Sequence, residues 1–136
     1  MSSFSGFTPK YLRLKPTDDD VVIVYVAVEL LTEDVNLEHF GHELFALVEQ
    51  FGCRRLVVDL HEVRVVTSAG LGKMITLHRK MHRHEGRVVF CDVQPAVEEV
   101  LRTSRLITYL VVRNDQEAAL AAVREEAVKN PTKETL

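Results

Sequence analysis

Two adjacent hydroxyl residues, Thr67 and Ser68, lie in the most informative stretch of the chain. They stand between a buried apolar run at residues 56–60 and an amphipathic pattern that begins at Leu71. This order predicts a strand, a short connection and a helix that begins at the hydroxyls. A helix start carries unpaired N–H groups and the positive end of the helix dipole, so it favours anionic groups. Each hydroxyl therefore either caps the helix or accepts a phosphate.

Three enzyme-like patterns were tested against the same residues. Residues 70–73, Gly-Leu-Gly-Lys, are similar to the end of a P-loop, but Thr67 stands where that loop needs a glycine and Met74 stands where it needs a magnesium-binding hydroxyl. The dinucleotide fingerprint fails because Ile75 occupies its third glycine position. A phospho-accepting receiver domain needs acidic residues after its first strand, whereas aspartates 18–20 precede the apolar run.

Histidine spacing raises the question of a metal site. His78 and His82 are four residues apart and His39 and His42 three apart, so each pair shares a helix face. Neither pair has an identifiable third ligand, and no HExxH pattern accompanies them. Asp59 is interpreted as a strand-end carboxylate, because no Ser/His or Cys/His arrangement can be assigned around it. We predict no metal site, no cofactor and no catalytic site, and therefore not an enzyme.

Composition predicts one small globular domain. The 136 residues include 17 basic and 20 acidic side chains, which give a net charge of −3 without a basic stripe, so nucleic acid is not an expected partner. The longest apolar run, Val21–Val28, is too short to cross a membrane, and the first ten residues do not have the pattern of a signal peptide. Cys53 and Cys91 lack CxxC spacing and are expected to be reduced, which favours a cytoplasmic location.

Apolar patterning predicts alternating strands and helices. The expected strands are residues 11–15, 21–28, 54–60, 87–91 and 107–112, and the first two form a hairpin. The expected helices are residues 37–51, 71–81, 95–104 and 116–128, followed by a frayed tail at 130–136.

Helix boundaries and strand order locate the hydroxyls. Pro95 opens the third helix, and Asn114 or Asp115 caps the last, which has Ala118, Leu120 and Ala121 among its apolar positions. The order implies a mostly parallel sheet with right-handed crossovers. Functional sites of such sheets lie beyond the carboxyl ends of the strands, where the sequence also places residues 67–68.

Four blocks in this order resemble the STAS domains, the family of the anti-sigma factor antagonists. They are residues 57–60 (Val-Val-Asp-Leu), 65–72 (Val-Val-Thr-Ser-Ala-Gly-Leu-Gly), 86–90 (Gly-Arg-Val-Val-Phe) and 94–97 (Gln-Pro-Ala-Val). The resemblance covers roughly residues 10–125. It implies an α/β fold, a single STAS-like domain with a mixed, mostly parallel sheet of about five strands and about four helices. The expected domain spans 10–128, with an N-terminal extension at 1–9 and a flexible C-terminal tail at 129–136.

The resemblance also implies a regulatory function. Family members bind an anti-sigma factor that is also a serine kinase, and thereby control sigma-dependent transcription. Phosphorylation at the helix start blocks binding, and a phosphatase, here expected to be of the PP2C type, restores it. The alternative is a STAS domain that is never phosphorylated and acts as a ligand sensor or a scaffold, of the stressosome-like or transporter-associated kind.

The candidate switch departs from the family pattern Asp-Ser-Ser-Gly-Leu-Gly. Ala69 occupies the position of the usual phosphate acceptor, and Thr67 replaces the aspartate. In a stressosome-like branch the acceptor directly follows the aspartate, a position that matches Ser68. Three states stay open: Ser68 is the acceptor, Thr67 is the acceptor, or the hydroxyls only cap the helix. The predicted partner-binding edge comprises Arg64, Gly70, Leu71, Lys73 and Met74, with close packing or a partner backbone as the reason for the glycines.

Overall fold

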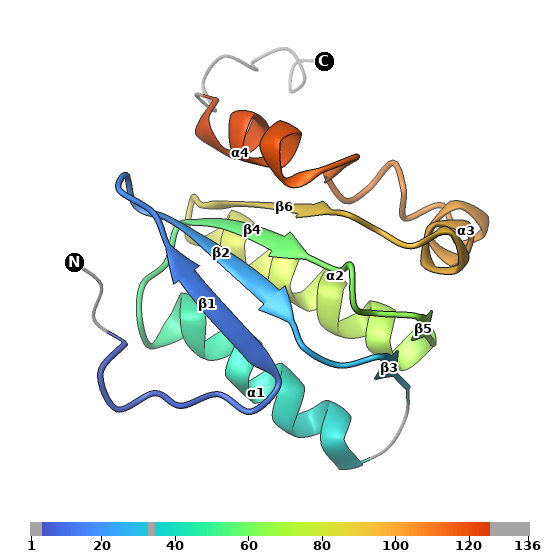
Figure 1. The fold of residues 1–136 in the computed structure, drawn as a ribbon, viewed down its shortest axis with the longest axis horizontal. Coiled ribbons are helices and arrows are strands. Elements are labelled where there is room, and N and C mark those ends of the chain that lie inside the picture. Colours follow the sequence, from blue (N-terminus) through green and yellow to red (C-terminus); the bar gives the residue numbers. More distant parts are fainter. Residues whose placement is uncertain (1–3, 33–34, 126–136) are drawn as a thin grey trace.

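The computed structural model describes residues 4–32 and 35–125. Its strands are β1 (Leu12–Pro16), β2 (Val21–Val26), β3 (Leu30–Leu31), β4 (Arg55–Asp59), β5 (Val65–Val66), β6 (Arg87–Cys91) and β7 (Val112–Arg113). Its helices are α1 (Val35–Glu49), α2 (Ser68–Arg83), α3 (Pro95–Thr103) and α4 (Gln116–Arg124). Figure 1 shows one α/β unit in which α1 and α2 lie on one side of the sheet and α4 on the other.

The main sheet has the order β1-β2-β4-β6-β7. The predicted hairpin is confirmed, because β1 pairs antiparallel with β2, and all other neighbours in this sheet are parallel. Register pairs join Tyr25 to Asp59 and Asp59 to Cys91, so β2, β4 and β6 end at the same edge. The predicted mixed, mostly parallel sheet of five strands with four helices is therefore confirmed in the described part of the chain.

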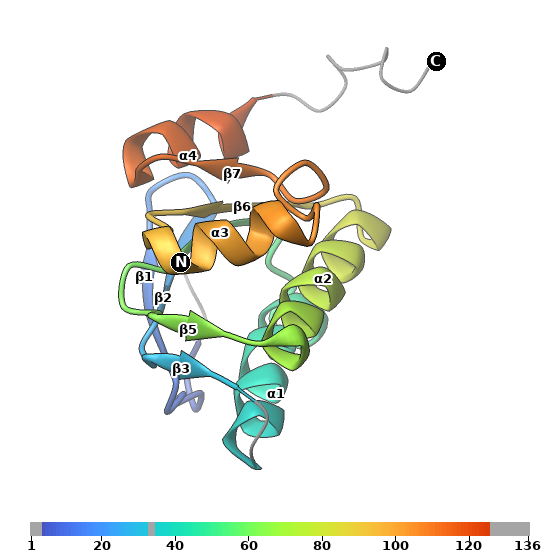
Figure 2. The ribbon, with the colours of Figure 1, turned by 90° about the vertical axis from the view of Figure 1, so that its right-hand side faces the viewer.

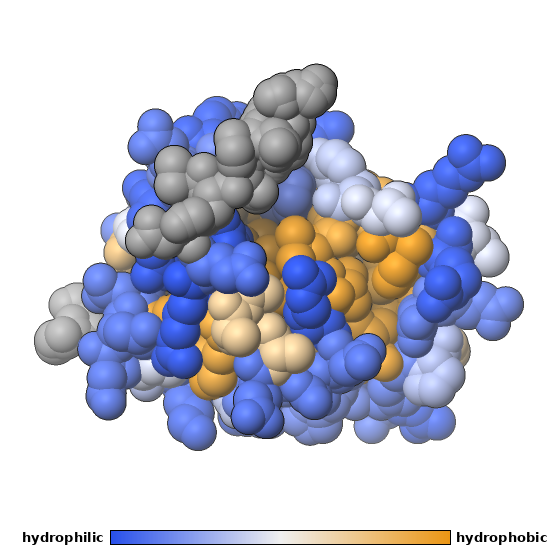
Figure 3. Space-filling view, turned by 90° about the horizontal axis from the view of Figure 1, so that it is seen from above, coloured by the Kyte–Doolittle hydropathy of each residue, from blue (hydrophilic) through white to orange (hydrophobic). Residues whose placement is uncertain are grey.

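The alternation of side chains along β2 explains why both of its faces are apolar. Val22, Val24 and Val26 enter the larger core beneath α1 and α2, whereas Val21 and Ile23 enter a smaller core beneath α4. Successive strand residues point to opposite faces, so a strand covered on both sides must be apolar throughout. On the α4 side Val21 and Ile23 are almost fully buried, although Figure 3 shows a group of apolar side chains at the surface of that face.

A second, two-stranded sheet was not predicted. It pairs β3 with β5 in parallel and extends the structure beyond the carboxyl ends of β2 and β4. Figure 2 shows β3 and β5 side by side, with β5 leading directly into α2 and α3 running close to β5. Because β5 directly precedes Thr67 and Ser68, this small sheet positions both hydroxyl residues.

The predicted strand at residues 107–112 is wrong over most of its length. Arg105 has a positive φ of 66°, and the amides of Leu106 and Ile107 donate back to the carbonyl of Leu101 at the end of α3. The segment that suggested a strand is instead a turn: Leu110 is buried in the larger core, the ring of Tyr109 lies against His78 on α2, and only residues 112–113 pair with β6.

The two chain ends also refine the expected boundaries. Phe4 and Phe7, from the expected extension, pack on Phe51 with ring centroids 5.2 and 5.0 Å from its ring. At the other end α4 stops at Arg124 instead of reaching Val128, because Glu125 is extended, and the expected tail lies outside the described residues. Among the residues described, we find no helix with the length and apolar character needed to cross a membrane.

Candidate functional site

Thr67 occupies the N-cap position of α2 but does not cap the helix with its side chain. Its backbone is extended, with φ −107° and ψ −179°, and its hydroxyl donates to the carbonyl of Leu31 at 3.3 Å. The backbone amide of Thr67 donates to the same carbonyl at 3.0 Å. Thr67 therefore continues the β3–β5 contact and holds the start of α2 against β3.

Ser68 is the first residue of α2 and is exposed to solvent. Within the described residues its hydroxyl makes no hydrogen bond, so it does not cap the helix either. The first turn of α2 contains no acidic side chain, which leaves the positive end of the helix dipole without a carboxylate. The cap interpretation is thus wrong for both side chains, and Ser68 has the more accessible hydroxyl.

The two glycines of the first turns have different environments. A Cβ on Gly70 would lie 2.5 Å from the carbonyl oxygen of Leu31 and 2.9 Å from a methyl group of Val66, so only glycine fits between α2 and the small sheet. A Cβ on Gly72 would meet nothing within 4 Å. Close packing therefore explains Gly70, whereas the space beside Gly72 is open and would accept a side chain.

Burial removes two residues from the predicted partner-binding edge. Leu71 is 7% exposed and Met74 is 2% exposed, and both lie in the larger core beneath the sheet. Their helical spacing places them on the buried face of α2, so their role is structural. Lys73 is partly covered as well: its ammonium lies 3.3 Å from Glu38 on α1 and over the ring of Phe45.

The exposed part of this edge comes from β3 and β5 instead. Leu30 and Val65 are register partners and are 59% and 45% exposed, which is unusual for large apolar side chains in this structure. Arg64, one residue before Val65, is exposed and forms a surface ion pair with Glu29 at 3.8 Å. Sequence reasoning named Arg64 but missed the apolar pair. In the sequence Leu30 and Val65 are two isolated apolar residues, and nothing in the pattern around either one indicates that they pair.

A second polar cluster lies at the ends of β4 and β6. The buried carboxylate of Asp59 accepts from the backbone amide of His61 at 2.9 Å and from Gln116 Nε2 at 3.0 Å, and the His61 ring Nδ1 lies 2.7 Å from it. Ligand atoms of Asp59, Cys91 and Asp92 all lie within 4.8 Å of one another. Burial raises the pKa of Asp92, and the Asp59 carboxylate raises it further.

This cluster ties the sheet to α4. Its oxygen and sulfur atoms are of the kinds that divalent cations use, but burial strongly raises the pKa of the Cys91 thiol, which therefore stays protonated. Asp59 already has donors from the loop after β4 and from α4. The network thus fixes the position of the carboxyl edge of the sheet.

The histidine pair His78 and His82 lies elsewhere, on α2. The two rings stack with centroids 6.3 Å apart, and burial lowers the pKa of His78.

Comparison with known proteins identifies a family and several relatives. Residues 13–119 match the STAS domain family. The chain is 31% identical over 112 residues to BtrV of Bordetella bronchiseptica, named as an anti-sigma factor antagonist, and the match covers 82% of this chain and 96% of BtrV. An anti-sigma F factor antagonist of Paenibacillus polymyxa is 25% identical over 73 residues, or 54% of this chain and 62% of that protein.

Solved structures share the fold at lower identity. An anti-sigma factor antagonist of Thermotoga maritima has a TM-score of 0.74 at 21% identity and covers 84% of this chain and 95% of its own. The Bacillus protein SpoIIAA in its phosphorylated form has a TM-score of 0.62 at 17% identity and covers 83% of this chain and 99% of its own. By its match over residues 13–119 and by its fold, the chain belongs to the STAS domain family.

Proposed function

We propose that this protein is an anti-sigma factor antagonist that binds an anti-sigma factor/serine kinase and so controls sigma-dependent transcription in the cytoplasm. The contact region is the docking surface, which we define as Leu30, Arg64, Val65 and Ser68. One observation carries the proposal. An exposed serine hydroxyl at a helix start, without a hydrogen bond to any described residue, lies two residues beyond a strand whose exposed Val65 pairs with exposed Leu30. Names of related proteins, BtrV among them, support the same function.

Phosphorylation of Ser68 would act through charge. A phosphoserine carries about −1.5 to −2 charges near neutral pH. The start of α2 tolerates that charge, because the helix dipole is positive there and no carboxylate occupies the first turn. A partner that packs on Leu30 and Val65 would have to desolvate the same dianion, which costs several kcal/mol when it is left unpaired. The fold would therefore survive phosphorylation while the complex would not.

Ser68 is the favoured acceptor among the three states that the sequence leaves open. The Thr67 hydroxyl is half-buried and already donates to Leu31, so a kinase would have to break that contact first. Ala69 has no hydroxyl. A PP2C-type phosphatase would return the Ser68 phosphate to the hydroxyl in this scheme. SpoIIAA, which has this fold, is known in both an unphosphorylated and a phosphorylated form.

The alternative function is a ligand-sensing or scaffold STAS domain without phosphorylation. Ala69 at the usual acceptor position is the observation that favours it. The two functions differ in whether the Ser68 hydroxyl oxygen is phosphorylated. Both are regulatory and not enzymatic.

The test uses the full chain and each purified serine-kinase anti-sigma factor of its source organism. We expect one of them to bind, and to transfer one phosphate from ATP to Ser68, as mapped by tandem mass spectrometry. Replacing Leu30 and Val65 together by serine should weaken binding at least about tenfold, since large apolar side chains dominate such interfaces. Tyr109→Ser is the control and should bind normally, because Tyr109 is the third large apolar residue exposed in the described part of the chain.

Three results would contradict the proposal. They are the absence of any binding kinase, unchanged affinity of the Leu30/Val65 double variant, and a phosphate located elsewhere. A partner that binds through Leu30 and Val65 while no kinase phosphorylates the chain would instead favour the scaffold function.

A further inference from the structure

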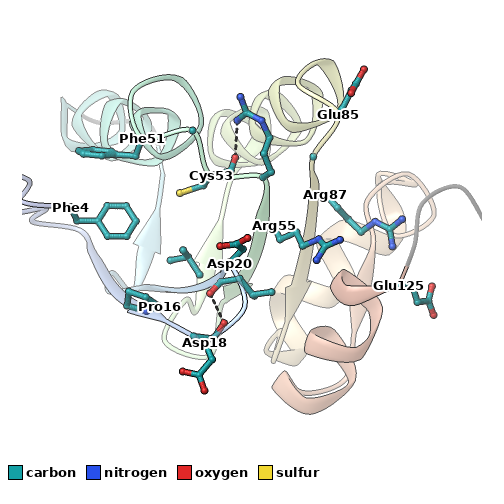
Figure 4. Close-up of a pocket in the computed structure, with 16 residues that line it drawn as sticks. Phe4, Pro16, Asp18, Asp20, Phe51, Cys53, Arg55, Glu85, Arg87 and Glu125 are labelled. Carbon is teal, nitrogen blue, oxygen red and sulfur yellow. Dashed lines mark hydrogen bonds between the residues drawn. The ribbon is translucent and has the colours of Figure 1, made fainter. Parts of the chain in front are cut away.

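A cavity lies at the edge of the sheet opposite the docking surface. It has a volume of about 1000 Å³ and opens among the amino ends of β2, β4 and β6. The β1–β2 turn, the segment between α1 and β4, and the turn before β6 form its walls, as Figure 4 shows. Ligand pockets for small molecules have volumes of about 300–1000 Å³, so the cavity is large enough for one.

Two arginines on neighbouring strands share one face of this cavity. Arg55 and Arg87 are the first residues of β4 and β6 and are register partners. They have the same strand parity as Val57 and Val89, which face α4, so both guanidinium groups project to the α4 side. Figure 4 shows the two side chains extending in the same direction. Two like charges are thus held side by side by the sheet register.

Neither arginine is neutralised by a carboxylate of the described residues. One nitrogen of Arg87 donates to the carbonyl of Ala122 in the last turn of α4, at 2.9 Å, and its other donors stay available. Arg55 is half-buried, yet among described residues it forms neither a hydrogen bond nor an ion pair. Two adjacent cations without a counter-ion favour an anion that accepts from both, and a phosphate group can do so because it has several charged oxygens.

The lining also contains the exposed Arg54 and four carboxylates, and Figure 4 shows the Asp20 side chain close to Arg55. The carboxylates of Asp18, Asp20, Glu85 and Glu125 are on exposed residues, where water and salt screen them. Burial raises the pKa of Cys53 to about 11, so this thiol adds no negative charge inside. Although the lining contains more carboxylates than arginines, no carboxylate of the described residues forms an ion pair with Arg55 or Arg87.

The end of the cavity away from the arginines is apolar. Phe4 and Phe51 lie there with ring centroids 5.2 Å apart, and the half-buried side chain of Cys53 lies between them and the arginine end in Figure 4. A ligand that fills both ends would have an anionic group and an apolar, preferably planar, body.

We propose that this cavity binds a small organic phosphate, with its phosphate group held by Arg55 and Arg87 and its apolar part packed against Phe4 and Phe51. The site is independent of the docking surface, since the two lie at opposite edges of the sheet. A small molecule bound there could regulate the domain without phosphorylation of Ser68.

The experiment titrates the full ¹⁵N-labelled chain with phenyl phosphate and, separately, with inorganic phosphate, and follows the backbone amides by NMR. Phenyl phosphate should cause saturable shifts at Phe51, Arg55 and Arg87 and none at Ser68, and it should bind more tightly than inorganic phosphate. Arg55→Gln should weaken binding at least about tenfold, as expected for a lost charge-assisted hydrogen bond. Arg79→Gln, an exposed arginine on α2 that does not line the cavity, is the charge-matched control and should bind normally.

Arg87→Gln gives a second test but also removes the contact to Ala122, so its folding is checked by circular dichroism. If that variant does not fold, Arg55→Gln alone decides, because Arg55 has no partner to lose within the described residues. The proposal is overturned if phenyl phosphate causes no saturable shifts, if both ligands bind equally, or if Arg55→Gln binds as tightly as the original chain. None of these results bears on the binding of an anti-sigma factor.

Discussion

Gly70 packs directly against Leu31: a Cβ at position 70 would lie only 2.5 Å from the Leu31 carbonyl oxygen. This contact joins α2 to the small β3–β5 sheet, and the same carbonyl accepts from the amide and hydroxyl of Thr67. One backbone group thus determines where α2 begins. Ser68, the next residue, is the first residue of α2 and is exposed.

Gly70→Ala should be strongly destabilising. The added methyl group would overlap backbone that cannot move without breaking β3–β5 pairing, so a loss of about 2 kcal/mol or more of the free energy of unfolding is expected. Gly72→Ala is the matched control: its Cβ meets nothing, and alanine is favoured over glycine within a helix by up to about 1 kcal/mol. Urea denaturation of both variants gives the comparison. Equal effects would show that Gly70 is not a packing position.

The two hydroxyls should contribute differently to stability. Thr67→Val removes the hydrogen bond to Leu31 and should cost about 0.5–1 kcal/mol. Ser68→Ala removes no hydrogen bond of the described residues and should change the free energy of unfolding by less than about 0.5 kcal/mol. Thermal unfolding of the two variants side by side measures both values. A larger loss for Ser68→Ala would mean that this serine caps α2 after all.

Leu71 and Met74 should behave as core residues. Leu71→Ala or Met74→Ala should lower the free energy of unfolding by about 2–5 kcal/mol, the usual cost of truncating a buried side chain. Partner affinity, corrected for the folded fraction, should not change, because neither side chain lies on the docking surface. If a fully folded variant loses affinity, Leu71 or Met74 contacts the partner and the prediction is wrong.

Asp92 should make stability depend on pH in a definite direction. Its pKa is raised in the folded state, so the folded chain holds this proton more tightly than the unfolded chain. The stability from Asp92 is therefore greatest below its unfolded pKa and falls as the pH rises through its folded pKa. Asp92→Asn should remove this fall, and asparagine tolerates the positive φ of 56° found here.

The measurement is the free energy of unfolding of both chains between pH 3 and pH 8, by urea denaturation, with the pH limits set around the ordinary aspartate pKa of about 4. The advantage of Asp92→Asn should grow as the pH rises and disappear in acid. A constant difference across the range would contradict the raised pKa.

Local signals predicted the parts of the fold that depend on neighbours in sequence. The apolar faces of β2, the Pro95 start of α3 and the Asp115 cap, which accepts from the Ala118 amide at 2.8 Å, all follow from short-range rules. The helix expected at residues 37–51 is α1, which ends at Glu49, and Gly52, with a φ of +66°, lies in the turn that follows.

The remaining features depend on contacts that short-range patterns do not encode. Strands β3 and β5 have two residues each, and their pairing joins positions 35 residues apart. The alanine-rich α4 offers several apolar faces, so the buried set, Ala119, Ala122 and Val123, differs from the positions that the sequence suggested.

The candidate site was predicted in position but not in composition. The order of elements placed residues 67–68 at the edge. The expectation that Leu71 and Met74 belong to the partner-binding edge is wrong, because the structure buries both side chains. The exposed apolar pair Leu30 and Val65 exists only because the two short strands β3 and β5 pair. A pattern within one element cannot reveal a surface made by two.

The central claim is that charge on Ser68 controls docking without altering the fold. The most direct measurement compares the binding of the serine-kinase anti-sigma factor to the original chain and to Ser68→Glu by calorimetry, with Ser68→Ala as the uncharged control. We expect Ser68→Ala to bind normally and Ser68→Glu to bind at least about tenfold more weakly, with unchanged thermal stability. Equal affinity of the glutamate variant and the original chain would contradict the account.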